Sequence, residues 1–86
     1  MRRSVRIDNS ADATAQYGIS AVANIEGETI TTFAEGEVKS GGAVVARWSR
    51  YREDTLTIRY AVADGRENIL AAIEAFCADA QAAVSA

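Results

Sequence analysis

The chain has 86 residues, of which 49% are apolar and 24% are charged, and its formal net charge is −3. This balance is typical of an ordinary globular domain and excludes a disordered tail. The length suits a single domain over residues 1–86, and so small a domain buries only about 60–65% of its unfolded surface, which makes dimerisation a natural source of stability. No apolar run approaches the roughly 20 residues of a membrane span, so we expect a soluble, cytoplasmic protein.

The charges fall into three blocks along the chain. Residues 8–37 contain six acids and no base, residues 39–66 contain six bases and three acids, and the charges from Glu67 onward are only acidic. The single cysteine, Cys77, excludes an internal disulfide, and a small chain without one is typical of a reducing compartment. The blocks predict separate acidic and basic surfaces if strand pairing keeps them apart.

Taken in chain order, the pattern predicts strands followed by one helix. Residues 4–7 form a short edge strand, and residues 8–16 are a loop or a short helix capped by Ser10. Residues 17–25, 29–39, 43–52 and 55–63 are β-rich, and short turn signals separate them. These signals are Glu26-Gly27, Ser40-Gly41-Gly42 and Arg52-Glu53-Asp54.

Residues 65–83 show helical periodicity. Asp64 suits the N-cap position, and Glu67 follows three residues later as in a capping box. The predicted fold is therefore α+β, an antiparallel β-meander of four to five strands with one C-terminal amphipathic helix packed on one face. The apolar stripe of the helix consists of Ile69, Leu70, Ile73, Phe76, Cys77, Ala80 and Val84.

Turn lengths predict which residues share a sheet face. A two-residue turn at Glu26-Gly27 pairs Ala23 with Ile30 and Ile19 with Ala34. Three-residue loops, with Gly42 and Asp54 left-handed, pair Val38 with Val44, Ala34 with Trp48, and Trp48 with Ile58. A bulge at Gly36 could reverse the faces to which the side chains at one end of that strand point. The helix then covers Tyr17, Ile19, Ile25, Ile30, Val38, Val44, Trp48, Leu56, Ile58, Tyr60 and Val62, and it leaves uncovered Ser20, Val22, Asn24, Thr29, Thr31, Phe33, Val45, Arg47, Ser49, Tyr51, Thr55, Thr57 and Arg59.

Residues suited to catalysis are scarce. The chain has no histidine, which removes the commonest general base and metal ligand. Cys77 lies on the apolar stripe and is expected to be a buried small hydrophobe. Glu35 and Glu37 share a strand face, but Gly36 between them suggests a solvated bulge. The glycines lack phosphate-loop spacing. We therefore predict a non-enzymatic protein with no cofactor, no metal and no small-molecule substrate.

A basic hairpin is the feature of the sequence that most favours nucleic-acid binding. Arg47, Arg50, Arg52 and Arg59 lie close to Trp48 and Tyr51 in the sequence. Alternation places Arg47 and Arg59 on the uncovered face and Arg50 and Arg52 on the other side. The acidic net charge also disfavours phosphate binding. Weak nucleic-acid binding through this hairpin remains an alternative function.

The order of elements resembles the double-stranded-RNA-binding domain if residues 8–16 are helical. That resemblance implies a lysine-rich start to the C-terminal helix. Here the corresponding residues are Asp64-Gly65-Arg66-Glu67-Asn68, so the resemblance does not extend to RNA binding.

The prediction that remains is a protein-binding module. Its concrete version is a small inhibitor from a phage or other mobile element, similar to an anti-CRISPR protein, whose acidic blocks occupy a partner's nucleic-acid-binding surface. The alternative is a structural homodimer closed by the uncovered sheet face. The predicted partner-binding residues are Val22, Phe33, Val45, Arg47, Tyr51 and Arg59 on the uncovered face and Glu26, Glu28, Glu35 and Glu37 in the acidic block.

Overall fold

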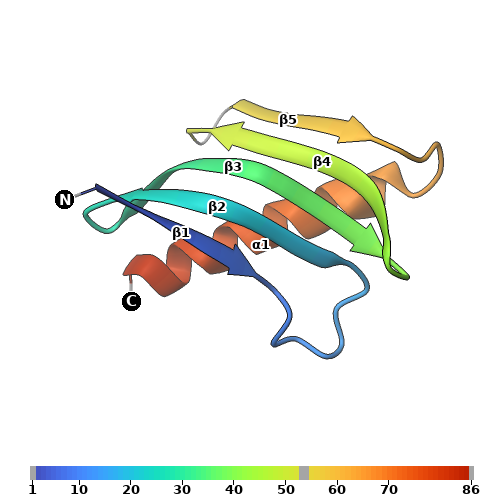
Figure 1. Ribbon diagram of the computed structural model, residues 1–86, viewed down its shortest axis with the longest axis horizontal. Coiled ribbons are helices and arrows are strands. Elements are labelled where there is room, and N and C mark those ends of the chain that lie inside the picture. The colour runs from blue at the N-terminus through green and yellow to red at the C-terminus, as the bar shows by residue number, and fades with distance from the viewer. Residues whose placement is uncertain (1, 53–54, 86) are drawn as a thin grey trace.

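A computed structural model describes residues 2–52 and 55–85. The elements are β1 (Arg2–Asp8), β2 (Gly18–Glu26), β3 (Thr29–Ser40), β4 (Ala43–Tyr51), β5 (Thr55–Tyr60) and α1 (Arg66–Ser85). The five strands form one antiparallel sheet in the order β1-β2-β3-β4-β5, and α1 crosses one face of it diagonally (Figure 1). This confirms the predicted α+β meander with a single C-terminal helix. Within the described residues, no helix is long and apolar enough to cross a membrane.

The core lies between α1 and the middle of the sheet. Its centre is an aromatic cluster in which the ring centroid of Phe33 lies 5.5 Å from that of Trp48 and 6.3 Å from that of Phe76. Trp48 and Phe76 meet edge to face at 6.0 Å, a favoured geometry for aromatic pairs. The buried side chains around this cluster are Ile19, Ala21, Ala23, Ile25, Ile30, Val38, Ala46, Ile69, Ile73 and Cys77.

The predicted pairing of β2 with β3 is wrong. The turn residues are Gly27 and Glu28, so Ile25 pairs with Ile30 instead of Ala23 pairing with Ile30. Two irregularities in the ladder then shift the register further, and Ile19 pairs with Val38. Each bulge adds one residue to β3, which moves the later side chains of that strand to the opposite face.

The bulge at Gly36 also changes the pairing of β3 with β4. Trp48 pairs with Gly36, not with Ala34 as predicted, and Glu35 beside it has a left-handed φ of 53°. A Cβ on Gly36 would lie 2.5 Å from two ring carbons of Trp48, so only glycine fits beneath the indole. Pairing of Trp48 with Ile58 is confirmed.

The turn between β3 and β4 is also tighter than predicted. Gly41 and Gly42 both have positive φ and form a two-residue turn, and Val38 pairs with Ala46 instead of Val44. Two consecutive left-handed residues are typical of the hairpin turn that matches strand twist. The predicted left-handed Asp54 lies outside the described residues.

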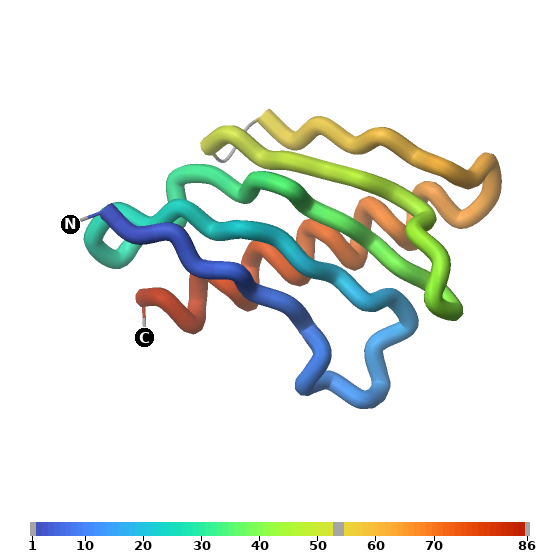
Figure 2. The backbone as a smooth tube through the Cα atoms, in the orientation of Figure 1, coloured from blue at the N-terminus to red at the C-terminus, as the bar shows by residue number. Residues whose placement is uncertain are grey.

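The segment between β1 and β2 is a loop, not a helix. Asp8 and Asp12 each accept hydrogen bonds from the residue two positions later, and the Asn9 side chain joins the loop to the start of β2. Such local bonds compete with helix formation. Figure 2 shows the loop projecting beyond the sheet. The helix on which the resemblance to the double-stranded-RNA-binding domain depended is therefore absent from this segment.

Candidate protein-binding surfaces

The uncovered sheet face is more polar than predicted. Phe33 was assigned to its centre, but its exposed fraction is 0% and its ring packs beneath Trp48 and Phe76. The bulge between Ile30 and Thr32 is the physical reason, because it turns Phe33 toward α1. Val45 is half-buried and packs against the core, so the expected apolar centre of a homodimer interface is missing.

Two of the predicted face residues remain there. Tyr51 pairs with Thr32 and Thr55 and is 58% exposed, and half-buried Val22 pairs with Arg6 and Ala34. Val22 on β2 and Tyr51 on β4 lie on opposite sides of β3, and the residues paired with them include the polar Arg6, Thr32 and Thr55.

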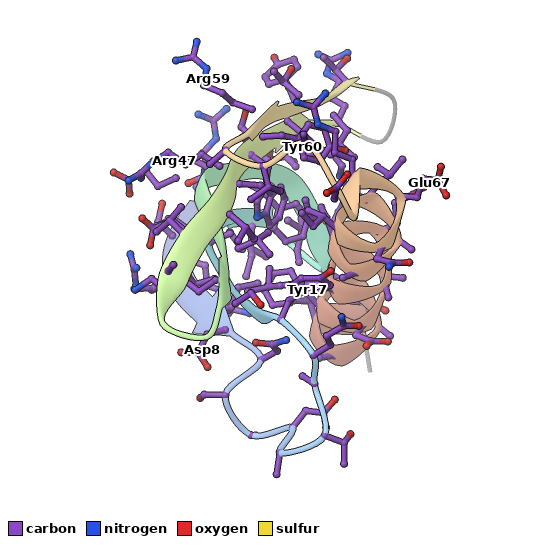
Figure 3. All side chains as sticks on the ribbon, turned by 90° about the vertical axis from the view of Figure 1, so that its right-hand side faces the viewer. Asp8, Tyr17, Arg47, Arg59, Tyr60 and Glu67 are labelled. Carbon is purple, nitrogen blue, oxygen red and sulfur yellow. The ribbon has the colours of Figure 1, made fainter. Side chains whose placement is uncertain are left out.

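Charged side chains dominate this face. Arg47 lies between Glu37 and Arg59 in the strand register, and its Nη1 donates to Oε2 of Glu37 over 2.9 Å. Figure 3 shows Arg47 and Arg59 pointing away from the helix. The Arg47 side chain is 65% exposed, so this ion pair contributes at most about 1 kcal/mol to stability.

The four predicted glutamates do not gather into one patch. Glu26 and Glu28 lie at the turn between β2 and β3, where Glu26 is 3.9 Å from Nε of Arg2. Glu35 and Glu37 lie at the bulge, toward the opposite end of β2. The structure therefore separates the acidic block into two pairs.

Three of the four hairpin arginines lie on the predicted faces, whereas Arg52 stacks over Tyr51 on the uncovered face. Arg47 and Arg59 occupy the uncovered face, whereas Arg50 pairs with Phe33 and Leu56 on the helix side. The guanidinium carbon of Arg50 lies 4.8 Å from the centroid of the Phe33 ring, and that of Arg52 lies 5.4 Å from the centroid of Tyr51. A continuous basic groove along the hairpin is therefore not formed.

The structure contains a surface that the sequence pattern did not predict, an apolar groove between α1 and the loop that follows β1. Because α1 packs mainly against β3, the inner side of β1 is left uncovered, and Val5 there is 39% exposed. Tyr17 points into this gap toward the helix (Figure 3). The groove has a volume of about 690 Å³, and its apolar lining is Ile7, Ala11, Ala15, Tyr17, Ile19, Ala23, Ile25, Ile30, Ala71, Ala72, Ala75, Phe76, Ala80, Ala83 and Val84.

Three carboxylates also line the apolar groove, namely Asp8, Asp12 and Asp79, and no lysine or arginine is among its described lining residues. The hydroxyl and amide of Ser10 donate to Asp8 over 2.6 and 3.0 Å and lower its pKa, and Thr14 does the same for Asp12. Both carboxylates therefore stay ionised to lower pH than ordinary aspartates.

Two signals in the sequence could have indicated the apolar groove. One is the pair of Asp-x-Ser and Asp-x-Thr turns at residues 8–10 and 12–14, which favours an ordered acidic loop. The other is the second, alanine-rich stripe of α1 beside the core stripe, from Ala71 to Ala83.

Reactive groups offer little chemistry. Cys77 is buried, and burial raises the pKa of its thiol to about 11 against the opposing effect of Arg50. A thiol of this kind is a poor nucleophile at neutral pH. Among the described residues, no three potential ligands gather to hold a metal ion.

Comparisons of this chain with protein-family models, curated proteins and solved structures found no match.

Proposed function

We propose that this protein is a non-enzymatic protein-binding module whose apolar groove receives a basic amphipathic helix of a partner. The observation that carries the proposal is the pairing of an apolar lining with three carboxylates and no base among its described residues. Helix-in-groove recognition uses apolar anchors at i, i+3, i+4 and i+7, and complementary charge at the rim selects the partner and speeds association.

The small side chains of α1 favour a helix as the occupant. Ala71, Ala75 and Ala83 line the groove without filling it, so the backbone of a second helix can approach α1 closely. A volume of about 690 Å³ lies in the range of about 300–1,000 Å³ that is usual for binding pockets. Two or three apolar anchors of a partner helix can therefore enter the groove.

The partner's charge connects this surface with the inhibitor hypothesis. Basic helices are common in proteins that bind nucleic acids, because lysine and arginine neutralise phosphates. A protein that covers such a helix competes with the nucleic acid for it. This supports the concrete version of the proposal, a small inhibitor of a nucleic-acid-binding partner.

The test uses designed peptides that fold into an amphipathic helix, with leucines at the anchor positions and lysines elsewhere. We expect this basic peptide to bind in a fluorescence-anisotropy titration. The backbone amides of the protein whose chemical shifts change on binding should belong to the groove residues. A peptide with glutamate in place of every lysine, and a scrambled peptide of the same composition, should not bind. Equal binding of the scrambled peptide would contradict the proposal.

Matched variants separate the apolar groove from general electrostatics. Asp79→Lys reverses a groove carboxylate, whereas Glu74→Lys reverses an exposed carboxylate of α1 outside the groove. We expect Asp79→Lys to weaken peptide binding about tenfold, which corresponds to about 1.4 kcal/mol, and Glu74→Lys to have much less effect. The same contrast should hold for Ala75→Arg in the groove against Ala82→Arg outside it. Equal losses in each pair would show that the groove is not the binding surface.

A further inference from the structure

A second hollow lies at one end of the sheet, where it is lined by the start of β1, the turn between β2 and β3 and the end of β4. These three segments meet at the left-hand end of the sheet, beside the C-terminal half of α1 (Figure 1). The hollow has a volume of about 1050 Å³ and shares only Ile25 and Ile30 with the apolar groove. The hollow and the apolar groove are therefore two distinct surfaces.

Four arginines line this hollow, Arg2, Arg3, Arg50 and Arg52, and we call it the arginine pocket. Glu26 is the one carboxylate among its described lining residues, and it lies 3.9 Å from Nε of Arg2 with both side chains largely exposed. Guanidinium groups stay protonated at all physiological pH values, so the pocket holds a local excess of positive charge. The pocket therefore differs in sign from the whole chain, whose net charge is −3 and whose apolar groove holds three carboxylates.

Arg50 is held in place before any ligand binds. Its side chain is half-buried, and its guanidinium lies 4.8 Å from the centroid of the buried Phe33 ring. Its Nε is buried and has no hydrogen-bond partner among the described residues. An unsatisfied buried donor is unfavourable, and an anion beside the guanidinium would offset part of that cost.

The remaining lining adds polar groups that suit a phosphate. Thr29 and Thr32 bring hydroxyl groups, which with arginines are common phosphate ligands. Tyr51 also lines the pocket, but it lies on the uncovered face with the guanidinium of Arg52 5.4 Å from the centroid of its ring. The pocket is also larger than a single inorganic anion requires.

From this arrangement we infer that the arginine pocket binds a phosphate-bearing ligand, with Arg50 as the fixed anchor and Arg3 and Arg52 as flexible partners. The phosphate can belong to a free nucleotide or to the backbone of a single-stranded nucleic acid, since both present the same chemistry to guanidinium groups. This site is separate from the peptide groove, and neither proposal depends on the other.

The test titrates the whole protein with inorganic pyrophosphate, ATP and a short oligothymidylate at low and moderate salt. Binding is followed by amide chemical shifts at the arginine pocket. We expect saturable binding that weakens as salt rises. The double variant Arg3→Gln/Arg52→Gln should bind each ligand at least about tenfold more weakly, a loss of about 1.4 kcal/mol.

Two controls make the result specific. Arg47→Gln/Arg59→Gln removes the same number of positive charges, two, from the uncovered face outside the pocket, and it should change the affinity less than about twofold. Arg50→Lys keeps the charge but loses the planar fork, so it should weaken binding without unfolding the protein. Circular dichroism on each variant checks that the fold is retained.

The ligands distinguish the two sources of phosphate. Tighter binding of ATP than of the oligonucleotide indicates a nucleotide site, and the reverse order indicates a nucleic-acid site. Either order supports the proposal when Arg3→Gln/Arg52→Gln weakens binding at least about tenfold. The proposal is overturned if no ligand binds at low salt, or if Arg47→Gln/Arg59→Gln weakens binding as much as the pocket variant does, because the attraction would then be diffuse.

Discussion

Replacing Gly36 with alanine tests the feature that reorganises the sheet. The added Cβ would lie 2.5 Å from Cδ2 and Cε2 of Trp48 and equally close to its carbonyl oxygen. Carbon atoms in contact prefer separations of about 3.5–4.0 Å, so the indole or the strand must move by about 1 Å. The indole is 4% exposed and lies against Phe33 and Phe76, and the carbonyl belongs to the backbone of β4. Neither group can move aside cheaply.

The magnitude follows from two opposing effects. Overpacking of this kind typically lowers stability by about 1–3 kcal/mol. Alanine also reduces the conformational entropy of the unfolded chain relative to glycine, which raises stability by about 0.4–1 kcal/mol. The midpoints of these two ranges differ by about 1.3 kcal/mol, so we expect Gly36→Ala to lower the free energy of unfolding by about that amount. For a domain of this size that change corresponds to a fall of roughly 5–10 °C in Tm.

Trp48 is the only tryptophan, so urea unfolding followed by its fluorescence measures this variant directly. Gly18→Ala is the matched control, because the nearest atoms to its added Cβ belong to Lys39 at 4.0 Å. That control should change stability by less than about 0.5 kcal/mol. If the two variants proved equally stable, the close approach of Trp48 to Gly36 would be wrong.

Three further outcomes are expected. Phe33→Ala should lower the free energy of unfolding by about 3–5 kcal/mol in a thermal melt, because it leaves a cavity in the aromatic core. A change near zero would show that Phe33 lies on the uncovered face. Gln81→Leu should lower stability by about 1–2 kcal/mol and speed hydrogen exchange at the Ile30 amide, because the Gln81 carboxamide accepts from that amide over 2.9 Å; unchanged exchange would show that this bond is unimportant. Since burial raises the pKa of Cys77 from 9.0 to about 11, the unfolded thiol ionises first, and stability that is complete below pH 9 should fall as the pH rises toward 11. Cys77→Ala should flatten this part of the pH profile, and an unchanged slope would assign it to other groups.

Local patterns in the sequence were sufficient for the order and type of the elements. The helix, observed over Arg66–Ser85, was predicted from a stripe with a period of 3.6 residues. The strands were predicted from β-branched and aromatic residues between glycine-containing turns. The pairing of Trp48 with Ile58 was also correct, because the register shifts occur only where β3 pairs with its two neighbours.

The assignment of faces failed for a physical reason. Side chains alternate along a strand, so one extra residue reverses every later position, and β3 contains two such bulges. Gly36 was recognised as a possible bulge, but local propensity does not decide whether it forms. Burial of the Trp48 ring over Gly36 decides it, and that contact joins two different strands. Phe33 lies in the core because of the other bulge, between Ile30 and Thr32, which the sequence pattern did not indicate.

Composition and periodicity thus determined the class of this protein, because each element depends mainly on residues close in the chain. They also indicated the scarcity of catalytic side chains, since the chain has no histidine. Only the tertiary structure decided which surfaces are open. The line that α1 takes across the sheet leaves β1 uncovered and creates the apolar groove, and the meeting of three strand ends creates the arginine pocket. Both surfaces combine residues far apart in the sequence, and their positions depend on packing that no local pattern encodes.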